Sequence, residues 1–236
     1  MEKGILYLIP TTLGETEISK VIPAYIFEII NSIGEYIVED EKSARRYLRK
    51  LRIKKSLDEI ILHPLNAHTL TESFASYLNS IEEGKNIGII SEAGCPGIAD
   101  PGAEIVKIAH KKNIKVVPLV GPSSILLALM ASGFNGQNFC FHGYLPKERN
   151  ERIRKLKDLE RTAQQKNQTQ IFIETPYRNQ HLLEDIISNC SLQTQLCIAC
   201  DITLPSEFIQ TKAINEWKKK LPDINKRPAI FLIYNH

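Results

Sequence analysis

The stretch NIGIISEAGCPGIADPG, residues 86–102, decides the fold of the first half of the chain. It opens with a short β-branched run of strand length and continues into a loop with two Pro-Gly turns, at residues 96–97 and 101–102. Such a loop exposes backbone N–H and C=O groups and lets a ligand approach the backbone closely. Because long connectors without secondary structure are uncommon in compact domains unless they are functional, we expect a binding loop here.

Short apolar runs alternate with longer amphipathic runs on both sides of this loop. Strands separated by helix-length segments are typical of βαβ units on a mainly parallel sheet. The predicted strands cover residues 4–9, 35–39, 59–63, 86–91 and 114–119, and the predicted helices cover residues 17–33, 41–52, 70–83 and 102–111.

The second half begins with a helical run at residues 125–130, for which Ser123 or Ser124 is the expected cap. Two further helices, at residues 148–165 and 178–190, separate the strands that follow. The last three strands are nearly consecutive, which predicts a mixed or antiparallel sheet. We therefore expect two α/β lobes, residues 1–119 and 120–236, with a ligand cleft between them. The predicted strands cover residues 139–143, 170–174, 196–201, 207–212 and 229–234.

Composition indicates an ordinary soluble globular protein. The 236 residues are 43% hydrophobic and 24% charged, and 30 basic against 27 acidic residues give a net charge of +3. No apolar run approaches the roughly 18 residues of a membrane span. The first residues lack the pattern of a secretory signal, so a cytoplasmic location is expected.

The five cysteines are scattered and odd in number, which favours reduced thiols over a disulfide framework. Cys197 and Cys200 form one CxxC pair, but a zinc site needs a second pair or a Cys/His partner. We expect two packed strand thiols and no metal.

Basic residues are concentrated in one segment. No acidic residue occurs between residues 43 and 57, which makes this segment a candidate phosphate-binding surface. A second basic stretch, residues 147–157, is diluted by Glu148 and Glu151 and is typical of a solvated helix face. The basic residues of the first segment are Arg45, Arg46, Arg49, Lys50, Arg52, Lys54 and Lys55.

Acidic residues stand at the carboxyl ends of several predicted strands. Glu39, Asp40, Glu174 and Asp201 can line a ligand site and act as a base, although such acids are more often helix caps. His63 is a candidate base or a structural hydrogen-bonding residue. No GxGxxG, P-loop or GxSxG spacing is present, so dinucleotide binding, phosphate cradling and triad hydrolysis are not supported.

Seven segments, in this order along the chain, carry a resemblance to a known family. They are LYLIPTTLGE at 6–15, VED at 38–40, SEAGCPGIADPG at 91–102, PLVGPSS at 118–124, GYLP at 143–146, FIETPYR at 172–178 and PAIFLIY at 228–234. Together they resemble the tetrapyrrole methylase superfamily, a two-lobed class of S-adenosylmethionine-dependent methyltransferases. The most similar branch methylates the ribose 2'-hydroxyl of a cytidine in small-subunit ribosomal RNA.

The resemblance implies a mainly parallel N-terminal sheet, a mixed C-terminal sheet, S-adenosylmethionine between the lobes and a homodimer. It implies that the RNA partner is held by Arg45, Arg46, Arg49 and Arg178, and that the candidate bases are Glu39, Asp40, Glu92 and Asp100. The cofactor contacts it implies are Pro10, Ala93, Gly94, Cys95, Ile98, Ser123, Ser124, Glu174, Thr175, Ile202, Pro228 and Ala229.

Three segments depart from that branch. EDTR is replaced by residues 39–42, SDAGTP by residues 91–96, and an ARELTK-like segment by residues 199–204. Each keeps its acid, but the basic partners are lost or altered. Three interpretations therefore stay open. The chain methylates ribosomal RNA, it methylates a tetrapyrrole or other small molecule, or it is a non-catalytic RNA-binding or regulatory protein that keeps the fold.

Overall fold

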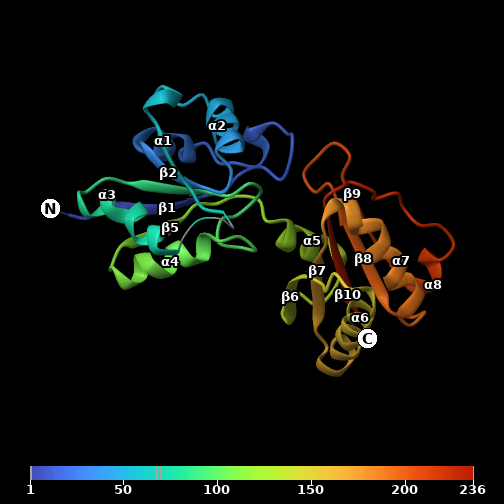
Figure 1. Cartoon of the computed structure of the whole chain (residues 1–236). Coiled ribbons are helices and arrows are strands. Elements are labelled where there is room, and N and C mark those ends of the chain that lie inside the picture. Colours follow the sequence, from blue (N-terminus) through green and yellow to red (C-terminus); the bar gives the residue numbers. More distant parts are fainter. Residues whose placement is uncertain (1, 67–68, 70, 236) are drawn as a thin grey trace. The chain divides into compact units, whose positions relative to one another are not determined.

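The computed structural model describes residues 2–66, 69 and 71–235. The chain divides into two compact units, Met1–Ser123 and Ser124–His236, which we call the N-terminal and C-terminal units (Figure 1). Each is built around its own five-stranded sheet, and each is described separately below.

The sheet of the N-terminal unit is entirely parallel, as predicted, with the strand order β3-β2-β4-β1-β5. Ile9 is in register with Ile90, and so is Val38, so β1, β2 and β4 end at the same level. The loops that follow these three strands must lie at one edge of the sheet. The strands are β1 (Ile5–Ile9), β2 (Glu35–Val38), β3 (Ile61–Pro64), β4 (Ile87–Ile90) and β5 (Lys115–Pro118).

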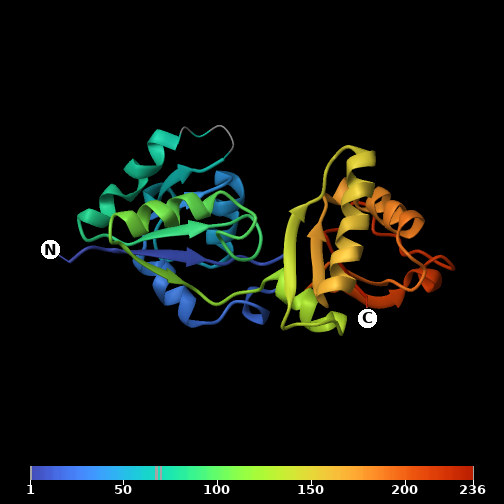
Figure 2. The same cartoon turned by 90° about the horizontal axis from the view of Figure 1, so that it is seen from below.

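Helices cover both faces of this sheet (Figure 2). On one face, α1 (Tyr25–Ser32) and α2 (Glu41–Lys50) pack against a core that includes Tyr36 and Ile90. On the other face lie α3 (Asn79–Glu82), α4 (Gly102–Lys111) and the 3-10 helix Thr71–Leu78.

Three predicted elements of this unit differ from the structure. The helix predicted at 17–33 is wrong in its first half, because Pro23 lacks an N–H and disfavours a helical residue before it. A 3-10 helix, Ile18–Lys20, precedes α1 instead. Most of the helix predicted at 70–83 is a 3-10 helix, and residue 70 lies outside the described residues. The strand predicted at 59–63 begins at Ile61, since a capping box at Ser56 and Glu59 nucleates a short 3-10 turn first.

The C-terminal unit holds the predicted mixed sheet, with the order β6-β7-β10-β8-β9. Only β6 and β7 run parallel, and the remaining neighbours are antiparallel. Helices α6, α7 and α8 contribute to one core with Phe172, Phe231 and Trp217. The elements are α5 (Ser124–Ser132), β6 (Phe139–Tyr144), α6 (Arg149–Lys166), β7 (Thr169–Ile173), α7 (Asn179–Asn189), β8 (Gln195–Cys200), β9 (Phe208–Ala213), α8 (Ile214–Trp217) and β10 (Ala229–Tyr234).

Cys197 and Cys200 are buried free thiols of β8, which confirms their interpretation as packed strand residues. They are three positions apart, so their side chains point to opposite faces of the sheet. The interpretation of residues 147–157 as a solvated helix face is wrong for Arg152, which is only 8% exposed and is ion-paired to Asp185.

Candidate cofactor and substrate site

Three loops of the N-terminal unit are tied together where β1, β2 and β4 end. The Thr11 N–H donates to the Gly94 carbonyl at 2.9 Å, and the Thr11 hydroxyl donates to the Ser91 carbonyl at 3.3 Å. The Glu92 N–H donates to Oε1 of Glu39 at 3.2 Å. The parallel register therefore brings together three segments that are far apart in the sequence, as expected for the ligand edge of an α/β sheet.

The loop at residues 91–102 is held in shape by its own polar groups. The Asp100 carboxylate accepts hydrogen bonds from the Gly97 N–H at 2.8 Å and the Gly102 N–H at 2.7 Å. Gly94, Gly97 and Ala99 have φ angles of 73°, 81° and 61°. The left-handed conformation costs a non-glycine residue such as Ala99 about 1–2 kcal/mol, so the surrounding contacts must enforce it.

The segment that follows β5 joins the same edge. The Cys95 thiol contacts the Pro122 carbonyl, with 3.5 Å between sulfur and oxygen. A Cβ on Gly121 would lie 2.2 Å from Cβ of Pro10, so only glycine allows this approach. Pro10, Cys95 and the segment leading to Ser123 are therefore neighbours, as the motifs predict.

A Gly121→Ala substitution is expected to lower the free energy of unfolding by about 1–3 kcal/mol, because the added methyl group forces the two loops apart. It should also weaken binding of S-adenosylmethionine, the cofactor that the sequence resemblance implies. Gly136→Ala is the matched control, since its added Cβ meets nothing within 4 Å. Urea denaturation and titration with S-adenosylhomocysteine measure both effects. Equal stability and equal affinity of the two variants would contradict the close-packing argument.

A pocket of about 240 Å³ opens at this edge. It is lined by the loops after β1, β2 and β4 and by one stripe of α2, at positions 43, 46, 47 and 50. Residues three and four apart share a face of a helix, so this stripe is continuous. The lining residues are Thr11, Thr12, Leu13, Gly14, Glu15, Glu39, Asp40, Ser43, Ala44, Arg46, Tyr47, Lys50, Ile90, Ser91, Glu92 and Ala93.

The four candidate bases have different surroundings. Asp40 caps α2, accepting from the Ser43 N–H at 2.7 Å, and these bonds lower its pKa. Asp100 is occupied by the loop amides, and burial raises its pKa while those amides lower it. Glu92 is an exposed lining residue.

Glu39 is the candidate base that is both part of the pocket and partly removed from water. Burial raises the pKa of its carboxyl, the Glu92 N–H lowers it, and the negative charges of Asp100 and Glu92 raise it further. One oxygen holds the Glu92 amide. A lining carboxylate with a raised pKa suits proton transfer at neutral pH better than an exposed one.

The predicted RNA-binding arginines do not act as one group. Arg46 lines the pocket, whereas Arg45 and Arg49 do not. Arg45 instead donates from Nη1 to the Leu57 carbonyl at 2.8 Å. Lys50 and Glu15 also line the pocket, although the sequence places Lys50 only in the basic segment and Glu15 only in the motif at 6–15.

Three segments of the C-terminal unit also meet at one sheet edge. Ala229 at the start of β10 is in register with Cys200 at the end of β8, and Ile230 with Ile173 at the end of β7. The predicted cofactor contacts after β7 and β8 and at the start of β10 are therefore neighbours. They are Glu174, Thr175, Ile202, Pro228 and Ala229, while Ser124 is the first residue of α5.

Ion pairs hold these segments in place. The buried Glu174 carboxylate pairs with Arg178, so this arginine is engaged within its own unit. Asp201 pairs with Arg227, at 2.8 Å from Nε to Oδ2, and also accepts from the Ser206 hydroxyl. Because the segment at 199–204 has lost the basic residues of the related branch, the sequence predicts that Asp201 lacks a basic partner. Arg227, from another part of the sequence, supplies one.

Two buried side-chain atoms at this edge lack a hydrogen-bond partner among the described residues, Oδ1 of Asn179 and Oγ1 of Thr203. Asn179 donates to the Arg227 carbonyl at 2.6 Å, and Thr203 has a φ of 71° in the turn after β8. A buried polar atom without a partner costs about 1–3 kcal/mol. Unsatisfied polar atoms and strained turns fit a segment that receives a ligand with hydrogen-bonding groups, such as a nucleoside.

Fold and site together define a methyltransferase with two α/β units. Residues 31–216 match the profile of the Tetrapyrrole (Corrin/Porphyrin) Methylases, and the chain belongs to this family. It is an S-adenosylmethionine-dependent methyltransferase, which confirms the predicted class and methyl donor. The bound cofactor supplies a methyl group on a positively charged sulfonium.

The chain is similar over nearly its whole length to proteins named ribosomal RNA small subunit methyltransferase I. It is 29% identical to that of Escherichia coli O157:H7, over 99% of this chain and 79% of the relative. It is 31% identical to that of Pasteurella multocida, over 98% of this chain and 79% of the relative.

Solved structures show the same fold at low identity. The methyltransferase CobJ has a TM-score of 0.65 and 16% identity, covering 98% of this chain and 94% of its own. A cobalt precorrin-4 methyltransferase has a TM-score of 0.62 and 15% identity, covering 97% and 94%. These structures confirm the two-lobed fold class. In the described part of this chain, no helix is long and apolar enough to cross a membrane.

Proposed function

We propose that the chain methylates a ribose 2'-hydroxyl of small-subunit ribosomal RNA. The observation that carries this proposal is the pocket where a partly buried carboxylate, Glu39, faces the same space as two cations of α2, Arg46 and Lys50. A ribose in RNA needs both, because its hydroxyl must lose a proton and its flanking phosphates are negatively charged. The names of the relatives support the same acceptor.

In this proposal Glu39 accepts the proton of the attacking hydroxyl. Asp40 and Asp100 have structural roles and do not take the proton. Asp40 caps α2, and Asp100 holds the shape of the loop at 91–102. Methyl transfer is a displacement in which positioning supplies much of the rate, so the rigidity of that loop matters.

We propose cofactor contacts in each of the two units. In the N-terminal unit, the backbone and small side chains of residues 93–95 and the exposed Ile98 would hold the cofactor with Pro10 and Ser123. In the C-terminal unit, the loops at residues 174–175, 202 and 228–229 would contact it, with Ser124. We also propose that the chain forms a homodimer.

The decisive experiment follows a labelled methyl group from S-adenosylmethionine. We expect transfer to deproteinised small-subunit ribosomal RNA and resistance of the product to alkaline cleavage at one ribose. Calorimetric titration should also show that S-adenosylhomocysteine binds. Label in a small-molecule extract alone would contradict the RNA acceptor and favour the tetrapyrrole or other small-molecule interpretation. Failure of the folded protein to bind the cofactor would contradict the proposed site as a whole.

A further inference from the structure

Lys50 lines the pocket but is already engaged by an acid of another loop. Its ammonium forms an ion pair with the carboxylate of Glu15, on the loop after β1. The pair holds down the pKa of Glu15, mainly through the hydrogen bond to Lys50. Both residues line the pocket, so a carboxylate of the chain occupies a cation that faces the substrate space.

Arg46 lies one helical turn before Lys50 on the same stripe of α2. Four residues along a helix correspond to about 6 Å, close enough for both cations to contact one anionic group. Among the described residues, none forms an ion pair or side-chain hydrogen bond with the Arg46 guanidinium, although its charge helps to lower the pKa values of Glu15 and Asp40. The stripe therefore presents one cation engaged by Glu15 beside a second one with donors for an incoming ligand.

The Glu15–Lys50 pair is placed to be exchanged rather than to stabilise the fold. The Glu15 side chain is 73% exposed and the Lys50 side chain 40%, and ion pairs in water contribute little stability. An RNA backbone phosphate carries two non-bridging oxygens at tetrahedral angles, so one can accept from Lys50 while the other accepts from Arg46. The Glu15 carboxylate thus stands where an oxygen of such a group would bind.

We propose that Arg46 and Lys50 form a subsite for one backbone phosphate of the acceptor RNA, and that Glu15 is its internal competitor. This inference rests on the proposed RNA acceptor. Before RNA binds, Glu15 neutralises Lys50, and the incoming phosphate displaces the carboxylate into solvent. Glu15 is therefore a specificity-determining residue, because a neutral ligand gains nothing that compensates for breaking the pair.

The test measures binding of deproteinised small-subunit ribosomal RNA to the full-length protein saturated with S-adenosylhomocysteine, over a series of salt concentrations. Glu15→Gln should tighten binding about threefold at low salt, because Lys50 is then unopposed. Lys50→Met should weaken binding and reduce the slope of log affinity against log salt by about 0.7, the value for one phosphate contact on a single strand. Adding Glu15→Gln to Lys50→Met should change nothing further.

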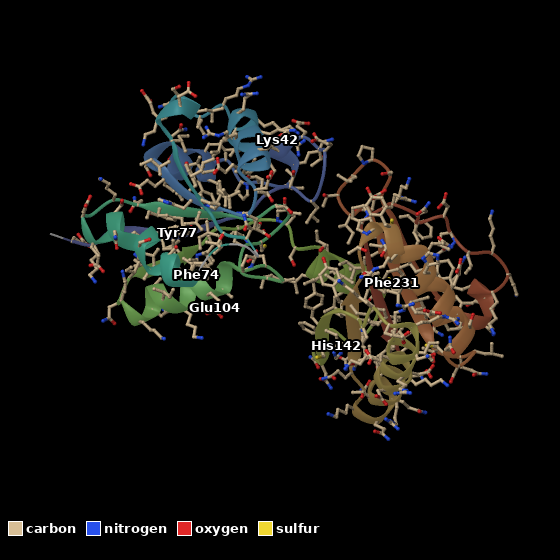
Figure 3. All side chains as sticks on the ribbon, viewed as in Figure 1. Lys42, Phe74, Tyr77, Glu104, His142 and Phe231 are labelled. Atoms are coloured by element: carbon tan, nitrogen blue, oxygen red, sulfur yellow. The ribbon has the colours of Figure 1, made fainter. Side chains whose placement is uncertain are left out.

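Glu104→Gln is the matched control for the loss of one negative charge. Glu104 pairs with Lys107 on the exposed surface of α4. Helix α4 packs on the opposite face of the sheet from α2. Figure 3 labels Glu104 on α4 and Lys42 on α2. We expect this control to bind RNA like the wild type, and all variants to melt within a few degrees of it.

The proposal is overturned if Glu15→Gln and Glu104→Gln change RNA affinity equally, or if Lys50→Met leaves the salt slope at the wild-type value. Either result, with ribosomal RNA still bound and methylated by the wild type, would remove the subsite and leave the proposed function standing. If neither the wild type nor any variant binds the RNA, both proposals fall together.

Discussion

An Asp185→Ala substitution is expected to lower the free energy of unfolding of the C-terminal unit by about 3–5 kcal/mol. Asp185 is almost fully buried in α7 and accepts from Nε of Arg149 at 2.9 Å and from Nη2 of Arg152 at 2.7 Å. Arg152 is also buried, and a guanidinium does not lose its proton in a protein. Without Asp185, a positive charge therefore stays in the protein interior without its counter-ion.

Urea denaturation followed by tryptophan fluorescence measures the unfolding of the C-terminal unit, which contains Asp185. Trp217 is the single tryptophan of the chain, is 1% exposed, and donates from Nε1 to the Leu196 carbonyl at 3.0 Å. Arg161→Gln is the control, because its ion pair with Asp158 lies on the exposed surface of the same unit. That substitution should cost about 0–1 kcal/mol. Similar unfolding midpoints for the two variants would refute the assignment of Arg152 as a charge that depends on Asp185.

This buried pair also shows what the sequence does not reveal. Arg152 and Asp185 are 33 positions apart and come from two different helices, α6 and α7, that pack against each other. The charge pattern around Arg152 is indistinguishable from that of a solvated helix. In contrast, the positions of β1, β4 and β10 follow from local apolar runs, and the structure agrees with them within a residue or two at each end.

The loops of the candidate site could be predicted from the sequence. Which of the four candidate acids is the best-placed base could not. The two Pro-Gly turns marked the loop at 91–102, because turn residues act locally. The strand order β3-β2-β4-β1-β5 places Glu39 beside that loop, and no local signal encodes this order. Glu39 and Asp40 are adjacent in sequence and both line the pocket, yet Asp40 is exposed and caps α2, whereas Glu39 is half-buried.

A Glu39→Gln substitution is expected to lower the rate of methyl transfer by roughly 10²–10⁴-fold while cofactor binding stays within twofold, because glutamine cannot accept the proton of the hydroxyl. The amide oxygen of glutamine can still accept the Glu92 N–H that Glu39 holds. The comparison is Asp40→Asn, which removes a charge next to Glu39 but keeps a good capping residue on α2. It should lose less than tenfold in rate, as measured by single-turnover transfer of labelled methyl groups.

The pH dependence of the wild type provides a second readout. A base must be ionised to act, so the rate should fall as pH drops through the raised pKa of Glu39, at a higher pH than for a glutamate in water. This acidic limb should be absent from the residual activity of Glu39→Gln. An unchanged limb in that variant would assign the proton acceptor to another group.

Stability separates a catalytic role of Glu39 from a structural one. An acid whose pKa is raised by folding stabilises the fold when protonated, and this contribution is lost as pH rises through the folded-state pKa. At neutral pH the wild type has lost it, whereas Glu39→Gln carries no charge to desolvate. The variant should therefore melt no lower than the wild type at pH 7. A lower melting temperature together with slow methyl transfer would mean that Glu39 acts by holding the loop at Glu92, and the proposed base would have to be abandoned.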